Sequence, residues 1–284
     1  MNPIDVDILL ATYRTPPALL DAQRASIDAQ KGVGTNVIVR EDSAGEGPAA
    51  NFSALMSESS APYAAFSDAD DVWLPGKLAR LVERMREIES AAAPGTPVMV
   101  FCDSTPTDAS LRPIPGGTFI ARQRVDVAKG LAFPRLLMQK FIAGNLMLFN
   151  AALRRKAGAV PPEALMHDAW VALVAAAFGR IGFVDEPLVL YRQHGANAVG
   201  ATLSASARQL GRAAEGAGAF RGRLAANIAQ ARAFVDRFGG EAPSAARALA
   251  SFPSSGWWAR RRAIVRHGLY KQGLCRNAAL LAFA

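Results

Sequence analysis

Short apolar runs alternate with helical patterns along the first hundred residues. The apolar runs lie at 6–10, 36–39, 63–66 and 97–101, and each has the length and composition of a buried strand. The segments between them have helical spacing: Pro75, for example, precedes Leu78, Leu81 and Met85, which recur at intervals of three and four residues. Strand–helix alternation with short connections predicts an α/β fold with a doubly wound, mostly parallel sheet.

The pattern becomes less regular after residue 104 and changes again after Gly200. The Pro-, Thr- and Gly-rich segment 104–118 predicts a loop. We expect helices at 131–141, 151–157 and 167–178, and strands at 146–149, 181–184 and 187–191, the last two joined by a tight turn. Beyond Gly200 the sequence is rich in Ala and Arg and lacks strand signals, which predicts a helical appendage broken near 239–240 and 253–256. The predicted domains are 1–203 and 204–284.

Composition limits the class of protein. With 51 % hydrophobic and 20 % charged residues over 284 positions, the chain can bury a large core. It contains no run of about 18 apolar residues, so we expect no membrane-spanning helix. The N-terminus carries acids and no basic region, so we expect no signal peptide. Cys102 and Cys275 are too few and too scattered for a disulfide framework, which favours a cytoplasmic location.

The charge of +8 is unevenly distributed. Residues 1–203 hold 19 Lys and Arg against 21 Asp and Glu, whereas residues 204–284 hold 13 against 3. Such a basic region suits an acidic partner, namely a phospholipid surface, a lipid-linked phosphate or nucleic acid, or else it is a solvated helical face. Segment 256–284, in which Trp257 and Trp258 precede basic and apolar residues at mixed helical spacing, predicts either a helix on the inner face of the cell membrane or a packing element.

An aspartate cluster directly follows the third predicted strand. Asp68, Asp70 and Asp71 place three carboxylates within four residues, where they repel one another. A divalent cation such as Mg²⁺ or Mn²⁺ relieves this repulsion, since hard cations prefer oxygen ligands. The alternative is a solvated, Asp-rich turn before the helix that starts at Pro75.

Further acids and one histidine lie beside predicted element ends. Glu41 and Asp42 end the second strand, where they serve turn chemistry or accept a hydrogen bond from a base or ribose. Asp168 opens a helix, as a first-turn residue or as a general base. His194 follows an apolar strand and is a candidate metal ligand. No G-x-x-x-x-G-K-[ST] or G-x-G-x-x-G motif is present, so P-loop and Rossmann sites lack support.

Five segments within residues 4–201 have a distinctive sequence, namely DILLATYRTPPALLDAQRASIDAQ, GPAANFSALM, AAFSDADDVWLPGKL, GNLMLFNAAL and HDAWVALVAAAFGRIGFVDEPLVLYRQHGANAVGA. In their sequence and in their order they resemble glycosyltransferase family 2, and the rhamnosyltransferase-like bacterial members in particular. The resemblance implies a GT-A fold and an inverting, Mn²⁺- or Mg²⁺-dependent transfer of rhamnose or a hexose. The implied donor is a dTDP- or UDP-linked sugar, and the implied acceptor is a saccharide, lipid-linked or free, in cell-surface polysaccharide synthesis.

The resemblance also implies roles for single residues. Those matched to the nucleotide-sugar site are Thr12, Tyr13, Arg14, Glu41, Asp42, Asn51, Asp68, Asp71, Gly144 and Asn145. Asp70 and His194 match metal ligands, Asp168 matches the catalytic base, and His167 and Trp170 match the acceptor side. The chain departs from the family pattern at Arg14, where Asn is usual, and at REDSAGEG in place of a DDGS-type turn, which leaves Glu41 and Asp42 as alternatives.

The sequence leaves two rival functions open. A sugar nucleotidyltransferase would need a Gly-rich, Lys-containing loop after the first strand, and ATYRTPP has neither residue. A nucleic-acid-binding protein would fit the isoelectric point of about 10.0, but the basic residues lie outside the acidic α/β region and form no known binding motif.

Overall fold

The computed structural model describes residues 5–193 and 217–283 of the chain. Seven strands form one sheet in the order β2-β1-β3-β6-β5-β7-β4. Their bounds are β1 Asp5–Thr12, β2 Gly34–Glu41, β3 Tyr63–Asp68, β4 Val72–Trp73, β5 Val98–Thr107, β6 Met147–Asn150 and β7 Arg180–Arg192. The four apolar runs of the first hundred residues are thus confirmed as β1, β2, β3 and β5. The predicted α/β fold with a mostly parallel sheet is confirmed as well.

The strand directions bring five carboxyl ends to one edge of the sheet. β1 pairs in parallel with both β2 and β3, and β5 pairs in parallel with β7. β6 runs antiparallel to β3 and β5, so its amino end lies at this same edge. In the register, Thr12 lies opposite Glu41, and Ala11 lies opposite Asp68. This carboxyl edge is where open α/β sheets bind ligands.

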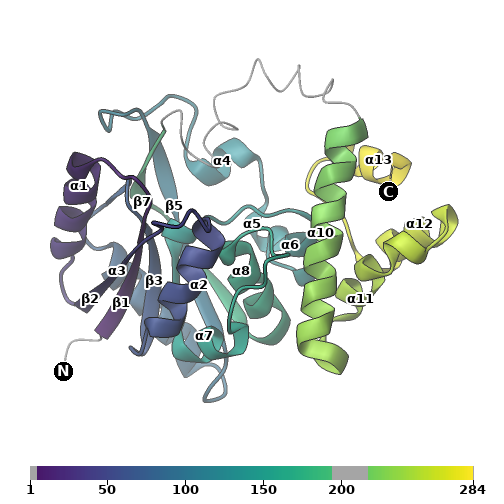
Figure 1. Ribbon diagram of the computed structural model, residues 1–284, viewed down its shortest axis with the longest axis horizontal. Helices are drawn as coiled ribbons and strands as arrows, with labels where there is room; N and C mark the ends of the chain where they lie inside the picture. Colours follow the sequence, from purple (N-terminus) through teal and green to yellow (C-terminus); the bar gives the residue numbers. More distant parts are fainter. Residues whose placement is uncertain (1–4, 194–216, 284) are drawn as a thin grey trace. The chain divides into compact units, whose positions relative to one another are not determined.

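Helices cover both faces of the sheet (Figure 1). Helices α1 (Pro17–Asp28) and α3 (Lys77–Ser90) lie on one side, and α2 (Pro48–Glu58), α7 (Ala151–Ala157) and α8 (His167–Phe178) lie on the other. Coverage on both faces explains why β5 is buried along nearly its whole length, from Val98 to Ser104 and again at its end. The first turns of α1 and α2 contain Pro17 and Pro48, where a missing N–H costs nothing.

Two predictions about the middle of the chain are wrong. β7 is one continuous strand and not two strands with a tight turn. Its register against β5 shifts on both sides of Asp103, so the extra residues near Asp185 and Pro187 bulge while the strand continues. β5 extends to Thr107, into the segment predicted as a loop, because β7 offers it a partner over this whole length. A short helix, α4 (Phe119–Gln123), follows.

The chain divides into a sheet unit, residues 1–123, 142–162 and 166–194, and a helical unit, residues 124–141, 163–165 and 195–284. The helical unit contains α5 Val127–Gly130, α6 Phe133–Met138, α10 Ala217–Phe238, α11 Ser244–Ala250, α12 Trp257–His267 and α13 Leu274–Phe283. The helical appendage is confirmed, with its breaks at Gly239–Glu241 and Phe252–Ser254. The predicted domain boundary at 203/204 lies outside the described residues. Within the described ranges, no helix combines the length and the apolar character needed to cross a bilayer.

Candidate active site

Three aspartates lie where the chain leaves β3 and crosses the carboxyl edge to reach β4. Asp68 ends β3, and Asp70 and Asp71 precede Val72, the first residue of β4. The side chains of Asp68 and Asp70 are half-buried, whereas Asp71 has no exposed surface. Two carboxylates of the cluster are therefore partly open to solvent at the edge, and the third belongs to the interior.

The carboxylate of Asp71 is held by two donors from distant segments. The side-chain amide of Asn145 donates to Oδ2, and the backbone N–H of Arg192 donates to Oδ1 at 2.9 Å. Burial raises the pKa of Asp71 well above its ordinary value, the charges of Asp70 and Asp68 raise it further, and the two hydrogen bonds oppose the shift. A cation beside Asp68 and Asp70 would favour the ionised form of all three acids.

A buried lysine lies beneath the cluster. Lys77 has no exposed surface, and its Nζ donates to the backbone carbonyl of Asn145 at 2.7 Å and lies 3.3 Å from the ring centroid of Trp73. Burial lowers the pKa of Lys77 to about 7, against the charges of Cys102, Asp71 and Asp68. Asn145 is thus held at its backbone by Lys77 and at its side chain by Asp71.

Arg192, at the end of β7, ties the cluster to the neighbouring loop. Its Nε donates to the backbone carbonyl of Asp70 at 2.8 Å, and its Nη1 donates to the carbonyl of Ala109. Only 5 % of the residue is exposed, so these bonds are shielded from water. Arg192 therefore holds the backbone of Asp70 with its side chain and the carboxylate of Asp71 with its own backbone N–H.

The start of α8 lies directly against the segment that contains Asn145. A Cβ placed on Gly144 would come within 2.6 Å of Nε2 of His167 and 3.4 Å of Cβ of Asp168. His167 is stacked on Phe52, with ring centroids 3.9 Å apart, and meets the ring of Phe66 at 4.6 Å. Asp168 is buried and accepts the N–H of Ala169 at 2.7 Å. The structure thus brings the predicted residues at 68–71, 144–145 and 167–168 together.

The ends of β1 and β2 are joined by a polar network. The Nδ2 of Asn51 lies 3.5 Å from the carbonyl of Thr12 and 3.2 Å from that of Arg40, and its Oδ1 accepts from Arg40 at 3.0 Å. Thr12 and Asn51 are both buried, so they hold the two strand ends at a fixed distance. Tyr13 is next in the chain and is 53 % exposed, with Arg14 in a left-handed conformation beside its ring.

The two acids after β2 have different environments. Asp42 is buried and accepts the N–H groups of Glu46 and Gly47 at 2.8 and 2.7 Å. Burial would raise its pKa, but these backbone hydrogen bonds lower it below the ordinary value. Asp42 therefore shapes the turn before α2, while the side chain of Glu41 is exposed.

One predicted residue, Trp170, is not brought into this arrangement. Trp170 has no exposed surface, and its indole N–H donates to the carbonyl of Ala157 at 3.0 Å. A buried ring leaves no face for a sugar, so the structure gives no support to the predicted role of Trp170 on the acceptor side. His194 lies outside the described residues.

Residues 21–157, just under half of the chain, match the model of the family described as "Glycosyl transferase family 2". We call residues 21–157 the family 2 region. The matched range includes the aspartate cluster, Lys77 and Gly144–Asn145 and ends before Asp168 and Arg192. A search of curated proteins finds no match to this sequence.

A solved glycosyltransferase structure shares the fold of the family 2 region and the segments around it. TarS 1–349 of S. aureus in complex with UDP superposes with a TM-score of 0.50 at 14 % identity, covering 94 % of this chain and 93 % of that one. The mannosyltransferase PcManGT of Pyrobaculum calidifontis, in complex with GDP-Man and Mn²⁺, gives 0.48 at 17 % identity over 99 % and 79 %. The fold is of the GT-A type, as the resemblance implied.

The aspartates of the family 2 region fit a divalent cation by their chemistry. Asp68 and Asp70 offer half-buried carboxylate oxygens, and Mg²⁺-type ions are commonly held by one or two carboxylates together with substrate phosphates. In the described part of the chain no three His, Cys, Asp or Glu side chains are grouped closely enough to hold a metal by themselves. The residues present therefore fit a shared site, completed by a phosphate ligand, and not a closed protein cage.

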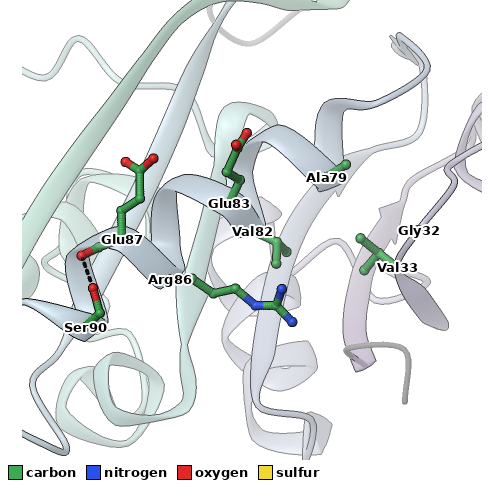
Figure 2. Close-up of a pocket in the computed structure, with 8 residues that line it drawn as sticks. All are labelled: Gly32, Val33, Ala79, Val82, Glu83, Arg86, Glu87 and Ser90. Atoms are coloured by element: carbon green, nitrogen blue, oxygen red, sulfur yellow. Dashed lines mark hydrogen bonds between the residues drawn. The ribbon is translucent and has the colours of Figure 1, made fainter. Parts of the chain in front are cut away.

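One hollow in the described part of the chain lies away from the aspartates. It measures about 550 Å³ and lies between α3 and the segment before β2, at the amino ends of the strands. Figure 2 shows Val82 and Arg86 extending from α3 toward Val33, while Glu83 and Glu87 point away from Val33. None of its lining residues is one of the predicted site residues, so this hollow is separate from the candidate site.

Sequence reasoning assigned no role to Lys77 and Arg192, although both lie inside the motifs that carry the family resemblance. Lys77 is the lysine of FSDADDVWLPGKL, and Arg192 is the arginine of LYRQHG. A lysine four residues after a buried tryptophan has no distinctive local pattern. Only the fold shows that Nζ reaches Asn145, which is 68 residues away in the chain.

Proposed function

We propose that this chain is a metal-dependent, inverting glycosyltransferase that moves a sugar from a nucleotide diphosphate-sugar to a saccharide acceptor. One arrangement supports this most directly: Asp68 and Asp70 are half-buried at the carboxyl edge, and Gly144–Asn145 separates them from the buried carboxylate of Asp168. Such a transfer needs metal-binding acids on one side of the reacting sugar and a base on the other side. The family match supports the same reaction class.

In the proposed reaction, the chain's own residues position two substrates and move one proton. Asp168 accepts the proton of the acceptor hydroxyl, whose oxygen forms the bond to the anomeric carbon. The bond from that carbon to the diphosphate breaks, and its electron pair leaves with the diphosphate. Asp70 and Asp68 would hold Mn²⁺ or Mg²⁺, which when bound neutralises the charge of the leaving diphosphate. A single displacement inverts the anomeric centre.

For the donor we propose a dTDP- or UDP-linked rhamnose or hexose. Thr12 and the exposed Glu41 end β1 and β2, where the family resemblance expects the nucleoside, and Asn51 of α2 donates to backbone carbonyls at both strand ends. PcManGT is named with GDP-Man, and TarS with UDP-GlcNAc, so guanine and uracil nucleotides belong in any test. The proposed acceptor is a saccharide of the cell surface, and His167 is proposed to act on that side by positioning Asp168.

The experiment is a thermal-shift panel of UDP, dTDP, GDP and CDP, each with and without Mn²⁺. We expect one nucleotide to raise Tm strongly only when Mn²⁺ is present, since binding to the folded state stabilises it. The variant Asp70→Asn should lose this Mn²⁺-dependent shift while its own Tm stays near that of the wild type. The matched control is Asp21→Asn, an exposed aspartate of α1, which should keep the full shift.

Retention of the full shift by Asp70→Asn would show that the metal assignment is wrong. A shift that is equally large without Mn²⁺ would argue against metal dependence but not against nucleotide binding. If none of the four nucleotides raises Tm, the proposed donor class itself is overturned.

A further inference from the structure

Large apolar side chains are exposed mainly in one short part of the helical unit. Of the seven exposed large hydrophobic residues in the described ranges, five lie between 257 and 281, namely Trp257, Trp258, Val265, Leu274 and Leu281. Trp258 is 74 % exposed and Leu274 is 90 % exposed. Scattered single apolar residues are ordinary on a protein surface, whereas a local concentration indicates an interaction site.

The outward face of α12 combines apolar and basic side chains. Trp258, Arg262 and Val265 follow one another at four and three residues, so they share one side of the helix, and Arg266 is next to them. All four are exposed, whereas Ile264, on the other side, is fully buried. We call these four residues the Trp258 face.

The two tryptophans differ in how firmly the fold holds them. The guanidinium of Arg261 lies 3.4 Å from the ring centroid of Trp257. It also donates to the backbone carbonyl of Trp257 at 2.9 Å and to the backbone carbonyl of Ala282 at 3.0 Å. Trp257 is therefore part of the joint between α12 and α13. Trp258 contacts the edge of Trp257, with centroids 4.4 Å apart, and otherwise extends into solvent.

The charge around this face has one sign. Residues 242–284 contain seven Lys and Arg and no Asp or Glu. A second copy of the chain would place this basic face against itself in a two-fold contact, and like charges disfavour such a contact. A nucleic-acid backbone would complement the arginines but would offer no apolar phase for Val265 and Leu274. Only an anionic lipid surface accommodates both kinds of side chain.

We propose that the Trp258 face docks on an anionic phospholipid surface, with α12 lying in the plane of the headgroups. Trp258 and Val265 would enter the boundary between headgroups and acyl chains, and Arg262 and Arg266 would pair with lipid phosphates. The proposal rests on residues of the helical unit alone, so it is independent of the glycosyl transfer proposed above.

The experiment uses the full chain and vesicles of phosphatidylglycerol and phosphatidylcholine, or of phosphatidylcholine alone. We expect the protein to sediment with the anionic vesicles at low salt and to be released at high salt. Tryptophan emission should shift to the blue on binding, because Trp73 and Trp170 are buried and the other two tryptophans of the chain are exposed. Quenching by brominated lipid should report insertion of the ring directly.

Two variants separate the contributions. Arg262→Glu/Arg266→Glu should weaken anionic-vesicle binding by at least about tenfold, since each basic residue near such a surface contributes on the order of a fivefold change in affinity. Trp258→Ala/Val265→Ser should abolish the blue shift and the lipid quenching. The matched control is Arg24→Glu/Arg86→Glu, which makes the same charge change on exposed arginines of α1 and α3 and should bind like the wild type.

Several results would overturn the proposal. These are wild-type protein that stays in the supernatant, equal binding to neutral vesicles, or an equal loss in the Arg24→Glu/Arg86→Glu control. A stable dimer in light scattering whose Trp258 is shielded from acrylamide would assign the face to a second copy. A mobility shift with DNA or RNA, in the absence of vesicle binding, would assign it to nucleic acid. Melting curves confirm first that each variant is folded.

Discussion

A substitution at Asp168 can separate its proposed role as a general base from its role in stabilising the start of α8. Asp168 lies buried in the first turn of α8, where an acid also interacts favourably with the helix dipole. Asp168→Asn keeps the size of the side chain and an acceptor for the N–H of Ala169, so we expect a stability loss of about 1 kcal/mol or less. Transfer should fall by roughly 10²–10⁴-fold, as for loss of a general base.

Steady-state kinetics with the donor found in the thermal-shift panel measure this effect, and the nucleotide-induced rise in Tm is the control that should persist. Near-normal turnover in Asp168→Asn would leave the residue only as a stabiliser of the helix start. A loss of nucleotide binding together with turnover would indicate that the substitution disturbs the donor side.

At the scale of elements, the contact between Gly144 and α8 depends on a missing side chain. A methyl group at Gly144 would come within 2.6 Å of His167, which the rings of Phe52 and Phe66 prevent from moving away. We expect Gly144→Ala to cost about 1–3 kcal/mol in the free energy of unfolding. Transfer should fall as well, by up to ~10²-fold, because Asp168 moves with the helix start.

Gly222→Ala is the matched control for this substitution. Gly222 lies within α10, and a Cβ there meets nothing within 4 Å. Alanine should raise stability by roughly 0.5–1 kcal/mol through its helix propensity. Chemical denaturation of both variants gives the two free energies, and wild-type stability and activity in Gly144→Ala would contradict the close contact.

The start of β1 is tied to the segment before β3 by one buried carboxylate. Oδ2 of Asp7 accepts Ser59 Oγ and the N–H groups of Ser60 and Ala61 at 2.8–2.9 Å, and Oδ1 accepts Asn36 at 2.8 Å. Burial alone would raise the pKa of Asp7, but these hydrogen bonds lower it below the ordinary value. The ionised group therefore contributes stability above its unfolded pKa of about 4, and the contribution is lost as pH falls through the lower folded pKa.

Asp7→Asn should therefore be less stable than the wild type by about 1–3 kcal/mol at neutral pH, because an amide cannot accept all four bonds. The difference should shrink as the pH falls below about 4, since the wild type then loses the same interaction. Urea unfolding at a series of pH values measures both curves. A difference that does not change with pH would show that the charge of Asp7 is not what stabilises this joint.

At the scale of the whole molecule, the four tryptophans form two populations. Trp73 and Trp170 are at most 2 % exposed, while Trp257 and Trp258 are 51 % and 74 % exposed. We expect acrylamide to quench part of the emission readily and to leave a shielded, blue-shifted part. Trp257→Phe/Trp258→Phe should retain only the shielded part, and uniform shielding of the wild type would mean that another molecule covers the Trp258 face.

The sequence by itself determined the positions of β1, β2, β3 and β5 and the placement of acids at the ends of β2 and β3. These features are local: apolar runs of strand length and prolines in first helical turns are recognisable within a few residues. The strand pattern alone therefore places Asp68 and Glu41 at one sheet edge, because parallel strands end together. The family resemblance added the prediction that Asp168 belongs to the same site as a base.

Only the tertiary structure decided which of these side chains are open and which are interior. Asp71 is buried because Arg192, 121 residues away, and Asn145, 74 residues away, donate to it, and no local pattern encodes such a pairing. Likewise, the ring of Trp170 is buried by other segments of the chain. The strand β7 continues past Pro187 because β5 pairs with it on both sides of that residue. Burial and long-range hydrogen bonding depend on what other segments supply, so they become visible only when the chain is folded.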